Sequence, residues 1–159
     1  MIRILMVLGL VLFVSPSSAA PAIDTTVVEP ALQQCILAAL SPEEDGSSPL
    51  ITDCVSVGSA ACRNADGGSS DSVIIKCNNQ EMAFWAALTQ FEMTELRSSL
   101  KSAARASLRT SERAWVAWKA ARCDLVRKTE KNQSLVAADV SYCEMETVAL
   151  RAIDLMAVF

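Results

Sequence analysis

Apolar side chains recur at helical spacing through the second half of the chain. Residues 77–159 contain no Gly or Pro, and Ala, Leu, Glu, Lys and Arg are frequent there. Comparable apolar stripes occur in residues 78–106, 108–128 and 135–158. This spacing places apolar side chains on one helical face, so we predict three long helices. The stripe of the first segment consists of Met82, Trp85, Leu88, Leu96 and Leu100, broadened by Phe84 and Phe91.

The two joins between these helices are marked with different clarity. Around residues 106–111 there is no helix breaker, so either Ser107 or Thr110 caps a new helix or one long helix bends there. The segment TEKNQS, residues 129–134, is a clearer stop, because Asn132 suits a left-handed turn position and Ser134 a following cap. We therefore expect an all-α domain over residues 77–159, in which a helical hairpin is joined by a third helix.

Residues 20–76 have a different character, rich in Gly, Pro, Ser and Asp. The stretches SPEEDGSSP (41–49) and NADGGSSD (64–71) read as loops. Between and before them, residues 29–40 and 49–62 read as short helices, each with a proline near its first turn. Four of the six cysteines fall in this region or at its far border. We predict a cysteine-rich arm of short helices that depends on disulfides for its order.

The first residues have the layout of a secretory signal peptide: Arg3, an apolar run over residues 4–14, then small side chains. The run of about 11 residues is well short of the roughly 20 that cross a bilayer, so we expect removal of residues 1–19; the alternative is an uncleaved membrane anchor. Cleavage after Ala19 fits the small residues there, and Ala22 would also serve. No cysteine stands at the cleavage site to receive a lipid. The prediction is a periplasmic or secreted protein.

Charge narrows the class of partner. The chain has 14 basic and 18 acidic residues, a net charge of −4, and loss of Arg3 with the signal peptide makes the mature protein −5. An acidic exported protein is poorly suited to nucleic acid or to an anionic membrane surface. It is better suited to a basic protein partner, and the sequence leaves the oligomeric state open.

The six cysteines favour disulfides over zinc. The chain has no histidine and no CxxC pair, and an even cysteine count is typical of a small exported protein. Fifteen connectivities are possible. Antiparallel packing of the hairpin would bring Cys123 and Cys143 level, and closing that loop is worth about 3 kcal/mol. Proximity in sequence favours two further pairs, Cys35 with Cys54 and Cys62 with Cys77. We expect neither a metal nor a cofactor.

The segment ERAWVAWKAARC, residues 112–123, is the richest in candidate chemistry. Its helical stripe consists of Leu108, Trp115, Trp118, Arg122 and Leu125. Large aromatics at this spacing usually pack inward, which we expect of Trp115. For Trp118 an inward position and an exposed platform for sugar rings are equally open. The outer edge, formed by Trp118, Lys119 and Arg122, is the candidate partner-binding surface.

Catalytic patterns are weak. There is no histidine and no G-x-S-x-G elbow. Glu144 and Glu146 stand two apart on a predicted helix, so they face different ways and do not form a glycosidase pair. We expect the remaining acidic side chains to be solvated or paired with Arg97, Arg122 or Arg151, and we expect no enzyme activity. These acidic side chains are Glu81, Glu92, Asp124, Asp139 and Asp154.

Three spaced patterns together resemble a known family. They are C77-x3-E81-x3-W85, W115-x2-W118-K119-x3-C123 and C143-x3-T147-x3-R151-x3-L155. Over about residues 77–155, roughly half of the chain, they resemble the lysozyme inhibitor LprI-like N-terminal domain family of bacterial envelope proteins. The chain departs from that family at Lys119 and Ala120, where Arg and Asp are usual, in the turn TEKNQS, and at residues 88–91. These departures put a carried-over polar site in doubt.

The resemblance implies a small all-helical exported domain, some of whose relatives bind and inhibit lysozyme. Animal lysozymes are basic, so an acidic partner would be steered towards them. A basic lysozyme-type muramidase is therefore the expected partner. The alternatives are an envelope structural or interaction module with another protein partner and, less favoured, a cell-wall carbohydrate binder or hydrolase.

Overall fold

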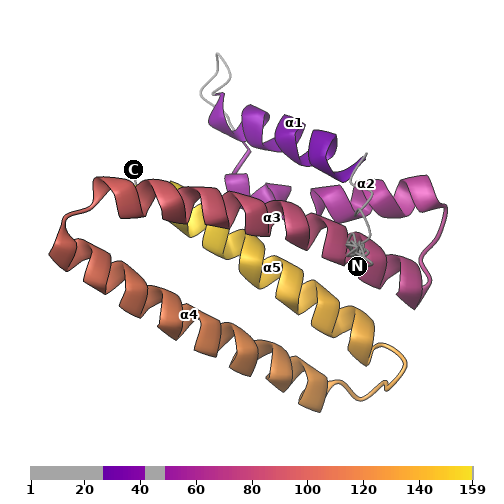
Figure 1. Cartoon of the computed structure of the whole chain (residues 1–159). Helices are drawn as coiled ribbons and strands as arrows, with labels where there is room; N and C mark the ends of the chain where they lie inside the picture. Colours follow the sequence, from indigo (N-terminus) through magenta and orange to yellow (C-terminus); the bar gives the residue numbers. More distant parts are fainter. Residues whose placement is uncertain (1–26, 42–48, 159) are drawn as a thin grey trace, which may run out of the picture.

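The computed structural model describes residues 27–41 and 49–158. The predicted signal peptide, residues 1–19, and most of the predicted loop 41–49 lie outside the described residues. The described residues contain helices and no strand, which confirms the all-α prediction. In chain order the elements are α1 (Val28–Leu40), the 3-10 helix η1 (Ile51–Cys54), α2 (Val57–Asp66), α3 (Asp71–Ser99), α4 (Ser102–Thr129) and α5 (Val136–Met156) (Figure 1).

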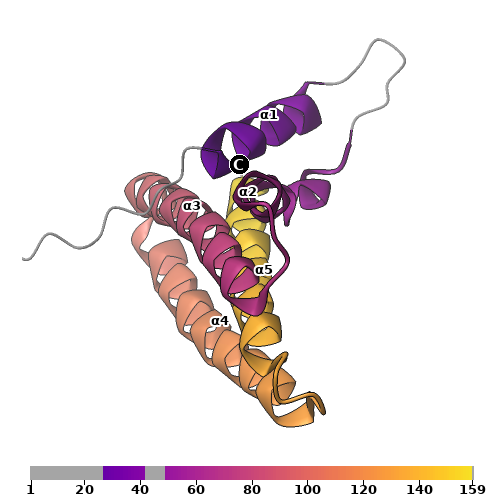
Figure 2. The ribbon, with the colours of Figure 1, turned by 90° about the vertical axis from the view of Figure 1, so that its right-hand side faces the viewer.

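The long helices α3, α4 and α5 form an up-down-up arrangement, with α5 packed along α3 and α4 packed against α5 (Figure 1). Helices α1 and α2 cover the side of α3 and α5 that faces away from α4 (Figures 1 and 2). Among the described helices, α5 is the one with which α4 has extensive contact. Helix α4 therefore forms one outer edge of the molecule.

The main core lies where α1, α2, α3 and α5 meet. Trp85 of α3 is fully buried there beside Leu32 of α1 and Met145 of α5. The described part of residues 20–76 thus shares one core with the long helices. A second, smaller cluster of Met93, Leu96 and Leu155 closes the far end of the bundle, with Leu100 and Leu108 against it.

Several predicted helix limits are wrong. Helix α3 begins at Asp71 and ends at Ser99, and α4 begins at Ser102, so the break falls at residues 100–101. Neither predicted alternative, a cap at Ser107 or Thr110 or an unbroken helix, is correct. Leu100 adopts an extended backbone and packs on the small cluster, so tertiary burial sets the break. The predicted helix over residues 49–62 is divided into η1 and α2.

The turns also differ from prediction in detail. Helix α2 ends on Gly67, whose φ of 68° is the left-handed conformation that glycine adopts without strain. In the turn before α5, Asn132 has no positive φ and Leu135, not Ser134, is the N-cap. The Asn132 side chain instead accepts hydrogen bonds from the backbone N–H and the hydroxyl of Ser134, at 3.2 and 2.8 Å. An asparagine side chain closes such a turn without a left-handed backbone.

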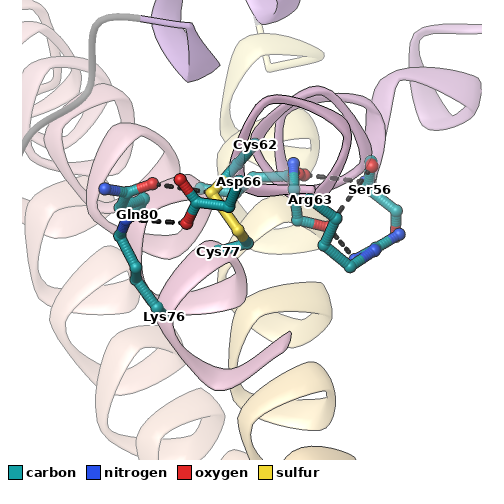
Figure 3. The surroundings of a disulfide bond; sticks show 9 residues. Ser56, Cys62, Arg63, Asp66, Lys76, Cys77 and Gln80 are labelled. Atoms are coloured by element: carbon teal, nitrogen blue, oxygen red, sulfur yellow. Dashed lines mark hydrogen bonds and ion pairs between the residues drawn. A yellow bond between two sulfur atoms is a disulfide. The ribbon is translucent and has the colours of Figure 1, made fainter. Parts of the chain in front are cut away.

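Three disulfides join neighbouring helices. Cys35–Cys54 joins α1 to η1, Cys62–Cys77 joins α2 to α3, and Cys123–Cys143 joins α4 to α5, which are the pairs that the sequence suggested. Their Cα–Cα distances of 5.5 to 5.7 Å suit a disulfide. Beside the Cys62–Cys77 bridge, Lys76 and Asp66 form an ion pair of 2.7 Å between α3 and α2 (Figure 3).

Candidate interaction surface on helix α4

Helix α4 is the most exposed of the long helices. Of its side chains, Cys123 alone is buried. The predicted stripe is only partly an inner face: Leu108 and Trp115 are half-buried, whereas Leu125 is 60 % exposed. Trp118, for which the sequence left both positions open, is 49 % exposed. Since α5 covers one side of α4, the other sides are open to solvent.

The three residues predicted to bind a partner lie together on α4. The guanidinium of Arg122 lies 5.4 Å from the centroid of the exposed Trp118 ring. The same guanidinium donates a hydrogen bond of 2.6 Å to Glu146 of α5. Lys119 follows Trp118 directly, and its ammonium lies 5.5 Å from the centroid of the Trp115 ring, about one turn earlier on the helix. Trp118 is therefore an exposed aromatic ring held by a side chain that is itself bonded to the neighbouring helix.

Nearer the start of α4, an ion pair fixes the helix on α5. Arg151 of α5, whose side chain is 10 % exposed, donates to Glu112 at 3.0 Å and to Ser111 at 3.4 Å. Its guanidinium also lies 5.9 Å from the Trp115 ring centroid. The sequence named Arg151 as a pairing residue but did not identify Glu112 as its partner. The spacing of Glu112 and Trp115, one helical turn apart, was the signal that could have found it.

The prediction that Glu81 is solvated or paired with an arginine is wrong. Glu81 is fully buried, and one of its oxygens accepts hydrogen bonds from the Ser56 N–H at 2.7 Å and the Trp85 indole N–H at 2.9 Å. Its other oxygen accepts from the Ser59 N–H at 2.6 Å. The backbone N–H groups of Ser56 and Ser59 lie at the start of α2. A carboxylate of α3 therefore caps α2, a task that side chains next to the helix start usually perform. Glu81 is a structural residue.

The half-buried carboxylates of α4 and α5 fall into small local groups. A hydrogen bond from Lys128 lowers the pKa of Asp124, and Arg127 acts in the same direction. Burial, followed by the neighbouring Glu130, raises the pKa of Asp139. Glu146 is bonded to Arg122 and not to Glu144. Each of these carboxylates is explained by local pairing.

One group of described residues has the spacing of metal ligands: Cys62, Asp66 and Cys77 (Figure 3). Both sulfurs form the disulfide, so neither is a thiolate able to bind zinc. The disulfide and the adjacent ion pair between Lys76 and Asp66 therefore explain why these three side chains lie close together.

An apolar groove lies on the opposite side of the molecule, between α1 and α3. Phe91, predicted to broaden an inner stripe, is 59 % exposed at its edge. Leu37 and Leu40 of α1 are also exposed nearby. The groove is lined by Glu29, Gln33, Ala83, Phe84, Ala87, Leu88 and Phe91.

Charge is divided unevenly between α4 and the rest of the chain. Helix α4 has seven basic and two acidic residues, whereas the remaining sequence has seven basic and sixteen acidic residues. The negative net charge of the chain therefore comes from residues outside α4. Helix α4 itself is basic and lies at one edge of the molecule. A partner approaching α4 meets a different electrostatic surface from one approaching elsewhere.

Comparison with known proteins agrees with the sequence patterns. No curated protein and no solved structure matches the chain. None of the described helices is both long enough and apolar enough to cross a membrane.

A family model described as "Lysozyme inhibitor LprI" matches residues 62–155, from the middle of α2 to the end of α5. The match begins 15 residues before the resemblance seen in the sequence and includes both cysteines of the α2–α3 bridge. Together with the three disulfides it indicates an extracytoplasmic location. The match spans more than half of the chain, which therefore belongs to the LprI lysozyme inhibitor family.

Proposed function

We propose that the protein is a non-enzymatic inhibitor that binds a basic lysozyme-type muramidase in the periplasm or outside the cell. The observation that carries this proposal is the family match over residues 62–155. Export follows in this proposal from cleavage of the signal peptide over residues 1–19. The three disulfides would then form in an oxidising compartment.

The proposed contact surface is the edge of α4 formed by the exposed Trp118 and the half-buried Lys119 and Arg122. Tryptophan and arginine are the residues most often found at the energetic centre of protein interfaces. Arg122 is bonded to Glu146, and the next residue, Cys123, is joined to α5 by a disulfide. A surface already held in place loses little conformational entropy on binding, which favours affinity.

The experiment uses the mature chain, beginning at residue 20 and with its disulfides formed, and a basic animal lysozyme. Lysis of a cell-wall suspension is followed by turbidity at increasing inhibitor concentration, and the complex is sought by size-exclusion chromatography. We expect saturable inhibition and a stable complex. Undiminished lysis at a large molar excess, with no complex on the column, would overturn the proposed function.

A matched pair of variants tests the surface separately. Trp118 and Val116 are exposed to the same extent on α4, at 49 % and 50 %. If Trp118 is an interface anchor, Trp118→Ala weakens inhibition by about 30-fold, the loss typical of a hot spot. Val116→Ala should change it by less than about threefold. Inhibition by Trp118→Ala equal to that of Val116→Ala would reject this surface while leaving the function standing.

A further inference from the structure

Basic side chains form a row that begins at the N-cap of α4 and continues along the first half of the helix. Lys101, Arg105, Arg109 and Arg113 follow one another at steps of four residues, and all four are exposed. Each step rises about 6 Å along the helix, so the row is about 18 Å long. We refer to these four residues as the basic ridge.

Nothing in the described chain neutralises the basic ridge. Lys101, Arg105 and Arg109 have no ion pair among the described residues, and Arg113 donates to the hydroxyl of Thr110 at 3.2 Å. The two acidic residues of α4 are bonded elsewhere, Glu112 to Arg151 and Asp124 to Lys128 and Arg127. The charge of the ridge is therefore available to a partner.

The ridge does not stabilise the helix that carries it. Like charges four residues apart on a helix repel one another and destabilise it by a few tenths of a kcal/mol per pair. Burial does not compensate, because no side chain of the first half of α4 is fully buried. A row of cations that weakens its own helix is more readily explained by binding than by folding.

The position of the ridge gives the shape of its partner. Trp118 follows Arg109 by nine residues, which is about 180° around a helix of 3.6 residues per turn. Both side chains are exposed, since α5 covers only one side of α4. An enzyme that contacts Trp118 and the ridge together must therefore partly surround α4. A concave cleft does so, and a flat surface does not.

We infer that the basic ridge enters the substrate cleft of the muramidase and binds the carboxylates that line it. This inference rests on the proposed function and names the part of the partner that is bound. Glycoside hydrolases carry a pair of Asp or Glu side chains on either side of the bond they cleave. Arginine binds carboxylates through two parallel hydrogen bonds, so Arg105, Arg109 and Arg113 match that chemistry. Inhibition then results from exclusion of the glycan chain and engagement of the carboxylates that hydrolyse it.

The division of charge also orients the approach. The acidic remainder of the chain attracts the basic exterior of the enzyme, while α4 is repelled from that exterior and attracted to an acidic cleft. Long-range attraction and local orientation thus come from different parts of the chain.

The test compares two triple variants in the lysis assay. Arg105→Gln, Arg109→Gln and Arg113→Gln together remove three charges from the ridge and retain good helix formers. The control replaces Lys76, Arg97 and Lys131 by Gln, which removes the same charge from exposed positions outside α4. We expect the ridge variant to inhibit at least about 30-fold more weakly, and the control to stay within about threefold of the unmodified protein. Circular dichroism checks that both variants are folded.

A second measurement locates the contact on the enzyme. A short N-acetylglucosamine oligosaccharide, which fills the cleft, should compete with the inhibitor for lysozyme in a binding assay. Wild-type protein that does not inhibit at all would overturn the proposed function itself. Inhibition by the ridge variant equal to that of the control would overturn the ridge alone. A weakened ridge variant without competition from the oligosaccharide would overturn the assignment to the cleft.

Discussion

The buried carboxylate of Glu81 offers the sharpest test of how this fold is held together. It lies on α3 and accepts two backbone N–H groups at the start of α2 and the indole N–H of Trp85. Ser56, the N-cap of α2, has a φ of 79°, a left-handed backbone that a serine rarely adopts. Glu81 therefore holds both the first turn of α2 and the unusual residue that precedes it.

The size of the effect follows from the hydrogen bonds. Glu81→Gln keeps one acceptor oxygen and replaces the other by an NH2 group, which then faces the N–H of Ser59 or that of Ser56. A hydrogen bond to a charged group contributes about 1.5–3 kcal/mol, so we expect a loss of about 2–3 kcal/mol in the free energy of unfolding. Glu81→Ala removes all three bonds and opens a cavity, and we expect a loss of about 4–5 kcal/mol.

Urea unfolding followed by far-UV circular dichroism, with the disulfides intact, measures these losses. Glu95→Gln is the matched control, because it makes the same substitution at an exposed position of the same helix. We expect that control to stay within about 0.5 kcal/mol of the unmodified protein, as surface substitutions usually do. A Glu81→Gln variant as stable as Glu95→Gln would refute the reasoning.

Three further predictions concern packing, covalent links and pH. In Gly58→Ala the new methyl group would lie 2.8 Å from Val28 Cγ1, so we expect a loss of about 1–3 kcal/mol in urea unfolding, whereas Gly68→Ala, with 3.9 Å to its nearest neighbour, should be nearly neutral. Replacing Cys123 and Cys143 together by serine should cost about 3 kcal/mol, and unreduced peptide mapping of the unmodified protein should recover the two cysteines in one linked fragment; free thiols there would contradict the hairpin. The raised pKa of Asp139, caused first by burial and then by Glu130, means that the folded chain holds this proton at a pH where the unfolded chain has lost it. Stability should therefore fall as the pH rises from 3.8 through the raised pKa, and Asp139→Asn should remove that part of the pH dependence measured by urea unfolding; an unchanged profile would contradict the assignment.

The long helices could be predicted because their signals are local. Eighty-three residues without Gly or Pro and with regular apolar spacing leave few alternatives to helix. The break between α3 and α4 could not be placed, because it depends on Leu100 reaching a cluster that includes Leu155, 55 residues away. No cap residue marks it: Lys101 is the N-cap of α4 and makes no side-chain cap bond. Local signals therefore give the elements, and distant contacts give their ends.

Glu81 shows why individual charged residues are harder to assign than helices. Its backbone partners, Ser56 and Ser59, precede it by 25 and 22 residues, and a backbone N–H leaves no mark in the sequence. Glutamate side chains are usually exposed, and this general tendency led to the wrong prediction for Glu81. The spacing of Glu81 and Trp85, one helical turn apart, was visible, but only the structure shows that their side chains bond.

The exposure of α4 could be predicted only in part, for a related reason. A stripe of Leu, Trp and Arg at helical spacing resembles an inner face, and for Leu108 and Trp115 that reading was adequate. Leu125 is exposed instead, and the open question at Trp118 is settled as an exposed ring with Arg122 on it, because α4 has one neighbouring helix and needs only a narrow buried stripe. The width of the stripe that a helix requires depends on its number of neighbours, which the sequence does not contain.

The manner in which α4 is attached explains how it can carry an unpaired basic ridge. Leu108 packs on the small cluster near the start of the helix, Glu112 binds Arg151 in its first half, and Cys123 is bonded to Cys143 near its end. These attachments all lie on the side that faces α5, so the remaining surface contributes little to folding and is free to vary for binding. Helices α1, α2, α3 and α5 supply the main core without α4 except at Trp115. The repulsion within the ridge is thus tolerated because separate, well-anchored contacts hold the helix, which is the arrangement expected of a surface selected for a partner.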